Sequence, residues 1–285
     1  MNRTDFRFAE RMRVRWVEVD LQKIVFNGHY LMYFDTAVAG WWRAMALPYE
    51  ATMHDLGGDF FVRKASVEYE DSARYDDQIE VGIRCERIGN SSMLLRGGVF
   101  RDGRLLVGGE LVYVYADPVA RRPLPVPGPL RELFLGYEAG EPVLDLQLGT
   151  WDQLGRQAQP IRQAVFVDEQ GIPADLEYDA ADASAVHAVA VNRLGRAVAT
   201  GRLLEHAPGV SKIGRMAVIR ALRGGGAGAA VLQALLDAAR TRGDREVILH
   251  AQASAVGFYA RRGFRTVGGP FEEAGIAHQA MALSL

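Results

Sequence analysis

The segment Arg223–Gly228 places four glycines within five positions, between an apolar strand pattern and a long amphipathic helix pattern. Without side chains in the way, the backbone N–H groups of residues 224–229 can point at one anion. The positive end of the helix dipole favours negative charge at the same place, and Arg223 adds a fixed positive charge. The segment therefore predicts a pyrophosphate cradle at a strand–loop–helix junction, and with it a phosphate-bearing cofactor in the C-terminal half.

Length and composition favour a cytoplasmic protein of two domains. The chain has 285 residues and a net charge of −2. We expect domains at 1–138 and 143–285, joined through residues 134–149. Neither half is basic, so binding of nucleic acid or of an acidic membrane is not expected. A single cysteine, Cys85, excludes an intrachain disulfide and a cysteine-based metal site, and no metal is predicted. No signal-peptide core and no run of about 18 apolar residues is present.

The N-terminal half has the pattern of an antiparallel sheet around one helix. Residues 11–19 alternate as in a strand. Residues 29–47 are apolar almost all round, which is typical of a buried helix. Strand-like runs follow at 60–70, 78–88, 91–101 and 104–116, with Asp102-Gly103 as a tight-hairpin signal between the last two. The predicted class is α+β, with the sheet curled around the helix.

The segment Trp16–Tyr30 resembles the signature of the hot-dog acyl-CoA thioesterases, in the 4-hydroxybenzoyl-CoA thioesterase and YbgC branch. The similarity spans residues 8–133 and includes 67–77 and the pair Ser91-Ser92. The chain departs from that pattern at Lys23, where glycine is usual, and at Glu18, where aspartate is common. In that family the aspartate matching Asp20 is the catalytic carboxylate.

The chemistry of an aspartate suits this role. An ionised carboxylate can attack a thioester carbonyl, or deprotonate the water that does. The start of the following helix can offer N–H groups to the developing oxyanion, so we predict that Asn27, Gly28 and His29 bind substrate. The alternatives are that Asp20 caps a turn or strand end and that His29 only caps or packs. Trp41 and Trp42 are expected in the core or at a subunit interface.

The C-terminal half alternates strands and helices. Gly224, Gly226 and Ala229 also satisfy a dinucleotide-binding fingerprint, with Glu246 about twenty residues on. We reject that interpretation because residues 219–222 separate strand from loop, and because Glu246 opens the next strand instead of closing it. The expected strands are 143–151, 185–192, 197–204, 212–218 and 246–252, and the expected helices are 153–170, 229–242 and 255–262.

Two segments in this half resemble the GNAT acetyltransferases, over residues 143–285. Arg215–Gly228 resembles their motif A and Leu249–Phe264 their motif B, while Arg162–Gly171 resembles the first helix and loop of one bacterial branch. The resemblance implies an acyl-CoA N-acyltransferase fold with a mixed sheet, and acetyl-CoA as substrate. It implies that Tyr259 protonates the departing thiolate. It implies pantetheine contacts from Met216, Ala217 and Val218, and pyrophosphate contacts from Arg223, Gly224, Gly225, Gly226, Ala227, Gly228 and Ala229.

Several assignments in this half stay open. The acceptor amine must lose a proton before it attacks, and Glu169, Asp179, Asp182, His187 and His250 are candidate bases. The acidic stretch 168–182 is either a solvated loop or an approach for a cationic acceptor. The alternatives are that the glycine segment is a plain helix-start turn and that Tyr259 only packs beside its aromatic neighbours.

Both halves thus point to CoA thioesters. We expect a bifunctional enzyme that hydrolyses acyl-CoA and transfers acetyl groups to a small-molecule or peptide amine. The alternative is a single activity, with the other domain serving as an oligomerisation scaffold or an acetyl-CoA sensor. Because a lone hot-dog sheet leaves strand edges unpaired, we expect a homo-oligomer, a dimer or tetramer, formed through that domain.

Overall fold

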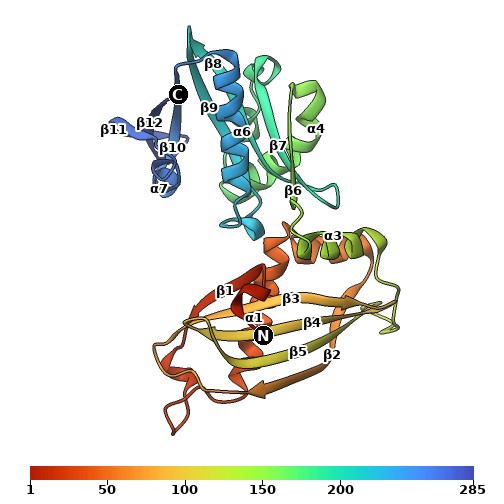
Figure 1. Ribbon diagram of the computed structural model, residues 1–285. Helices are drawn as coiled ribbons and strands as arrows, with labels where there is room; N and C mark the ends of the chain where they lie inside the picture. Colours follow the sequence, from red (N-terminus) through yellow and green to blue (C-terminus); the bar gives the residue numbers. More distant parts are fainter. The chain divides into compact units, whose positions relative to one another are not determined.

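The computed structural model describes residues 1–285, and the chain divides into two compact units, Met1–Val143 and Leu144–Leu285 (Figure 1). The expected fold classes, an antiparallel sheet with one long helix followed by a mixed sheet, are confirmed. The predicted domain limits, 1–138 and 143–285, differ slightly from this division and stay a prediction. None of the helices combines the length and apolarity needed to cross a bilayer.

The first unit is a five-stranded antiparallel sheet in the order β1-β3-β4-β5-β2, with α1 against one face (Figure 1). Two shorter helices, α2 and α3, complete the unit. The bounds are β1 Phe8–Arg13, α1 His29–Ala44, α2 Tyr49–Leu56, β2 Asp59–Tyr69, β3 Gln78–Ile88, β4 Ser92–Arg101, β5 Arg104–Ala116 and α3 Gly128–Glu138.

Two glycines on neighbouring strands let α1 approach the sheet closely. Gly97 of β4 pairs with Gly109 of β5, and the ring of Phe34 from α1 lies over both. A Cβ at Gly97 would stand 2.5 Å from that ring, and one at Gly109 would stand 2.6 Å from it. Phe34 is completely buried as a result. A glycine pair and one aromatic side chain thus set the depth at which the helix is seated.

The composition of residues 29–47 predicted a helix buried on every side, but α1 has an exposed face. Trp41 and Trp42 lie in the core as expected, with 0% and 3% of their surface exposed. Met32, Asp35, Ala39 and Arg43, which follow one another three or four residues apart, are exposed. One face of α1 is therefore open to solvent.

The first predicted strand, 11–19, is wrong in its second half. β1 ends at Arg13, and Trp16–Glu18 forms a 3₁₀ turn in which Trp16 is 69% exposed. The buried Glu18 carboxylate causes this turn, because it accepts the Arg15 N–H at 2.7 Å and the Tyr33 hydroxyl at 2.7 Å. The chain therefore leaves the sheet before it reaches Asp20.

The predicted connection 134–149 is also too long. Residues 128–138 form α3, which packs on the first unit through the fully buried Phe134. The Phe134 ring stacks on Trp41 with 5.1 Å between centroids. Because β6 begins at Leu144, only residues 139–143 connect the two elements.

The second unit is a seven-stranded sheet in the order β11-β12-β10-β9-β8-β7-β6, in which β9 and β10 are parallel and the other pairs antiparallel. Strands β11 and β12 were not predicted. The bounds are β6 Leu144–Gly149, α4 Trp151–Arg162, α5 Ala174–Glu177, β7 Val186–Asn192, β8 Ala197–Ala207, β9 Val210–Val218, α6 Ala227–Arg242, β10 Glu246–Gln252, α7 Val256–Ala260, β11 Arg265–Glu273 and β12 Ile276–Ser284.

Helices cover both faces of this sheet. On one face, α4 packs through Leu154 and Ala158 against Val189 and Val191. Gly201 is the strand partner of Ala188, so it faces the other way from Val189. A Cβ at Gly201 would stand within 3.0 Å of side chains of α6, which places that helix on the second face. The central strands are therefore enclosed, and the open part of the unit lies near β9 and β10.

The parallel pair β9–β10 separates partway along its length. Residues Val210–Ile213 of β9 pair with Glu246–Leu249 of β10. Beyond these residues the two strands continue to Val218 and Gln252 without pairing to each other. A bulge at Arg215, whose φ of +52° is unusual for a residue with a side chain, falls in the unpaired part of β9. The sheet therefore opens towards the glycine segment that follows β9.

Candidate active sites

The opening between β9 and β10 leads into a cavity of about 550 Å³. Its walls come from the π-helical segment Gln163–Glu169 (η3), from β9 and the start of α6, and from the chain after β10. The predicted residues on this wall are Met216, Val218, Arg223, Gly224, Gly226, Ala227, Gly228, Ala229 and Tyr259. The candidate base Glu169 also lines it. Further lining residues, not predicted as site residues, are Val165, Gln170, Leu222, Gln252, Ser254, Ala255, Phe258, Arg261 and Arg262.

Two predicted residues do not line the cavity. The Ala217 side chain is buried in a cluster with Ile161 and Phe166, since strand alternation turns it away from its neighbours. The N–H of Gly225 donates to the Leu222 carbonyl at 3.2 Å, within a turn. The expectation that every N–H from 224 to 229 is free for an anion is therefore wrong at Gly225.

The rest of the glycine segment has the geometry of an anion cradle. Gly224 and Gly226 have φ of +83° and +92°, a region that strongly favours glycine, and a Cβ on either would meet open space. Helix α6 begins at Ala227, so the N–H groups of its first turn lack intrahelical acceptors. These groups and the helix dipole favour a phosphate there.

Tyr259 packs in the cavity wall as part of an aromatic cluster. Its ring centroid lies 4.9 Å from that of Phe258 and 5.8 Å from that of Phe264. Burial raises the pKa of the Tyr259 phenol to about 12. The phenol is therefore protonated at neutral pH, which suits a proton donor, and the packing role and the donor role are compatible.

Of the five candidate bases, Glu169 alone lines this cavity. Both of its carboxylate oxygens accept from Arg223 at 2.7 Å, and this hydrogen bonding lowers the pKa of Glu169. His250 on β10 instead contacts Glu273 at 3.0 Å and Lys212 at 3.4 Å. The three remaining candidates belong to a separate buried network.

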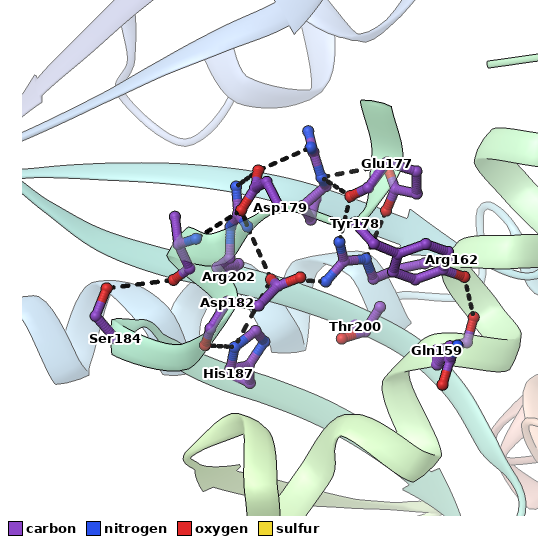
Figure 2. A network of polar contacts seen from close by, with 12 residues as sticks. Gln159, Arg162, Glu177, Tyr178, Asp179, Asp182, Ser184, His187, Thr200 and Arg202 are labelled. Atoms are coloured by element: carbon purple, nitrogen blue, oxygen red, sulfur yellow. Dashed lines mark hydrogen bonds and ion pairs between the residues drawn. The ribbon is translucent and has the colours of Figure 1, made fainter. Parts of the chain in front are cut away.

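That network, drawn in Figure 2, shows that the end of the acidic stretch 168–182 is not a solvated loop, because Glu177 and Asp182 are buried. Arg162 of α4 is 1% exposed and donates to Glu177 at 2.5 Å and to Asp182 at 2.8 Å. Arg202 of β8 donates to Asp182 at 2.7 Å and to Asp179 at 2.6 Å. Glu177, Asp179 and Asp182 are therefore paired with arginines of the second unit, whereas Asp168 and Asp175 are exposed.

His187 and the bulge residue Arg215 extend the same network. His187 is 1% exposed and donates from Nε2 to the Asp182 carbonyl at 3.0 Å, and burial lowers its pKa. Arg215 lies 3.2 Å from the Glu177 carboxylate and 3.1 Å from that of Asp179. The unusual backbone of Arg215 is thus held by partners on its own side chain, and His187 has no access to a substrate.

In the first unit, Asp20 lies in the loop between the 3₁₀ turn and α1. Its Oδ1 accepts the Gln22 N–H at 2.8 Å, and its carbonyl accepts the Lys23 N–H at 2.9 Å. Lys23 has φ of +62°, in the region that favours glycine, which agrees with the glycine usual at this position.

The other predicted residues of this unit lie at the start of α1. Asn27 and Gly28 are exposed, and the Asn27 carbonyl accepts the Tyr69 hydroxyl at 3.1 Å. The His29 N–H donates to the Phe26 carbonyl at 2.9 Å, so it is not available to a substrate. Its ring Nδ1 lies 3.3 Å from Met32 Sδ.

Large apolar side chains of the same region are exposed to an unusual degree. This exposed apolar group consists of Trp16, Val17, Leu21, Phe26, Leu31, Met32, Tyr69 and Tyr75. Such exposure in one region indicates an interaction surface or a ligand site.

Comparison with known proteins gives a separate result for each unit. The family model of the acetyltransferase (GNAT) domain matches residues 155–285, and that of the thioesterase superfamily matches residues 22–107. The chain is 35% identical over 122 residues to the uncharacterized N-acetyltransferase YjcF of Bacillus subtilis, covering 42% of this chain and 86% of that protein. It is 27% identical over 128 residues to the acyl-CoA thioester hydrolase YbgC of Escherichia coli, covering 45% of this chain and 93% of that protein. A crystal structure of a thioesterase from Thermus thermophilus, solved with coenzyme A and zinc, is 25% identical, with a TM-score of 0.42 over 49% of this chain and 98% of that one.

Proposed function

Since the chain belongs to the thioesterase superfamily through its first unit and to the GNAT acetyltransferases through its second, we propose that it is a bifunctional enzyme of CoA thioesters. The first unit hydrolyses acyl-CoA to a free acid and CoA. The second transfers an acetyl group from acetyl-CoA to an amine. The functional domains take the limits 1–138 and 143–285.

One observation carries the proposal for the second unit. The anion cradle, the unpaired halves of β9 and β10 and the protonated Tyr259 all meet in a single cavity. A CoA thioester needs these three features in that order, from its pyrophosphate through its pantetheine arm to its sulfur. Residues 216–218 contact the arm through their backbone, whichever way their side chains point.

The transfer then follows from ordinary acyl chemistry. The acceptor nitrogen attacks the thioester carbonyl carbon, the C–S bond breaks, and the Tyr259 phenol donates its proton to the leaving sulfur. The proton that the nitrogen loses on forming the amide passes through water and restores the phenol. The acceptor enters as the free amine, because four of the five candidate bases lie outside the cavity wall and Arg223 holds the fifth, Glu169.

In the first unit, the Asp20 carboxylate attacks the thioester carbonyl or activates the water that does, and the CoA thiolate leaves. N–H groups at the start of α1, near Asn27 and Gly28, stabilise the developing oxyanion. The His29 ring contributes packing, since its N–H already has an acceptor.

We propose that this site is completed by a second copy of the chain. The sheet order ends at β2, which leaves one edge of that strand unpaired, with Phe61 and Val62 39% and 55% exposed. The exposed apolar group near Asp20 would be covered in the same assembly. Light scattering on a size-exclusion column should give a dimer or tetramer, and a single species of 31.3 kDa would contradict the assembly.

The test of the two activities is a panel of acyl-CoA esters, scored by free thiol release with and without amine acceptors. We expect thiol release without an amine, lost in Asp20→Asn, and additional amine-dependent release that Asp20→Asn retains. If Asp20→Asn hydrolyses every ester as fast as the wild type does, the first unit is a scaffold and the single-activity alternative is correct. If no amine raises thiol release, the second unit acts as a sensor.

A further inference from the structure

Two consecutive residues at the end of η3 join opposite walls of the cavity in the second unit. Glu169 receives two hydrogen bonds of 2.7 Å from Arg223, at the start of the glycine segment. Gln170 and Gln252, at the end of β10, exchange side-chain amide hydrogen bonds of 2.9 Å and 3.4 Å. All four residues line the cavity.

The two bridges meet the cavity at the point where the sheet is open. Arg223 follows β9, and Gln252 ends β10, and these are the strands that separate beyond Ile213 and Leu249. Residues 169–170 therefore connect the far ends of both strands to a third element, η3. A ligand that runs from the glycine segment into the opening must pass this connection.

We propose that Glu169 and Gln170 form a strap that opens to admit the CoA thioester and closes over its pantetheine arm. This inference rests on the proposed binding of CoA by the second unit. It makes both residues positioning residues for the cofactor, and it removes Glu169 from the candidate bases.

Charge explains how the strap opens. Arg223 pairs with a carboxylate at one edge of a cradle suited to a pyrophosphate, so an arriving phosphate competes with Glu169 for the same guanidinium. The side chains of Glu169 and Arg223 are 31% and 41% exposed, so solvent weakens their attraction. The Gln170–Gln252 pair is neutral and resists opening only through its hydrogen bonds.

The experiment uses the full chain with a fluorescent label beside the strap. Asp168 is exposed, and Cys85 is buried with a pKa raised to about 12, so an Asp168→Cys variant can be labelled at the new thiol. Stopped-flow mixing with CoA then gives association and dissociation rate constants for this cavity alone. Gln170→Ala and Glu169→Gln break one bridge each. Asp237→Asn is the control, since it breaks an exposed pair with Arg240 on α6, outside the cavity wall.

A strap lowers both rate constants, so loss of a bridge should raise both. We expect Gln170→Ala to raise association and dissociation by a similar factor, about threefold, with little change in Kd. Glu169→Gln should raise association further, because it also removes a negative charge from the path of the phosphates. Asp237→Asn should leave both constants unchanged.

The inference is overturned if Gln170→Ala raises dissociation alone, which is the signature of a lost contact without gating. It is also overturned if both bridge variants match the wild type while CoA still binds, and in that case the proposed function stands. If CoA gives no signal and no binding by calorimetry in any variant, the proposed function of the second unit fails as well.

Discussion

Removing Arg162 should destabilise the second unit strongly, because its guanidinium holds two buried acids. Arg162 is 1% exposed, donates to Glu177 at 2.5 Å and to Asp182 at 2.8 Å, and also donates to the Glu177 carbonyl at 2.7 Å. In an Arg162→Met variant, Glu177 keeps only Arg215 as a cation, 3.2 Å away, and Asp182 keeps Arg202.

The arrangement sets the size of the loss in unfolding free energy of the second unit. Breaking a buried ion pair on one side costs about 3–5 kcal/mol, and the remaining arginines place this case near the lower end, at about 3 kcal/mol. With an unfolding entropy of roughly 2.1 cal/mol/K per residue, a unit of this size changes by about 0.3 kcal/mol/K. Arg162→Met should therefore lower the Tm of the second unit by about 10 °C.

The difference in Tm between Arg162→Met and the wild type should shrink as the pH falls. Burial already raises the pKa of Glu177, so its folded state binds a proton more tightly than its unfolded state does. Loss of Arg162 raises that pKa further. Above the folded pKa the variant carries a buried Glu177 charge that only Arg215 compensates, and below it Glu177 is neutral and the difference in stability from wild type falls.

Differential scanning calorimetry at pH 7 and pH 5 measures both effects, and the transition of the first unit serves as an internal control. The double variant Arg162→Met, Glu177→Gln should recover part of the loss, because it removes the stranded charge. A Tm of Arg162→Met within 2 °C (about 0.6 kcal/mol) of wild type at pH 7 would refute this reasoning. So would a double variant less stable than the single one.

Three further predictions concern the two cavity residues Tyr259 and Ala229 and the packing of α1 on its sheet. Tyr259→Phe should lower the rate of amine acetylation about a hundredfold with little change in CoA affinity. The wild-type rate should not fall between pH 7 and 10 through deprotonation of the phenol, since the pKa of Tyr259 is about 12. An unchanged acetylation rate in the variant would exclude Tyr259 as the acid. Ala229→Glu puts a carboxylate at the anion cradle, where a first-turn acid favours the helix, so CoA affinity of the second unit should fall at least about tenfold by calorimetry, whereas Ala229→Gln should lose much less. Gly97→Ala should destabilise the first unit by about 1–3 kcal/mol in urea unfolding because it displaces Phe34, whereas Gly108→Ala meets only the end of Met1 at 3.2 Å and should be tolerated; equal effects would contradict the packing argument.

Local patterns allowed much of the fold to be predicted. Strands β3 and β5 match their predicted limits, because alternation and the Asp102-Gly103 turn are signals within a few residues. Helix α3 was missed, because its anchor Phe134 is held by ring contacts with Trp41, Trp42 and Phe60, all far away in the chain. The early end of β1 depends likewise on Tyr33 reaching back to Glu18.

In the sites, too, local patterns could be predicted and contacts between residues far apart in the chain could not. The loop-to-helix geometry of the glycine segment could be predicted because clustered glycines before a helix start are a local pattern. The burial of Asp182 in the acidic stretch 168–182 was not predicted, because its partners Arg162 and Arg202 lie twenty residues away on either side. The turn that engages the Gly225 N–H depends on a carbonyl three residues earlier, which composition does not reveal.

The central claim is that each unit binds its own CoA thioester, and titration calorimetry with CoA on the full chain tests it most directly. The account predicts two molecules of CoA per chain in the wild type and one in Ala229→Glu. No binding, or a single site that Ala229→Glu leaves intact, would contradict it.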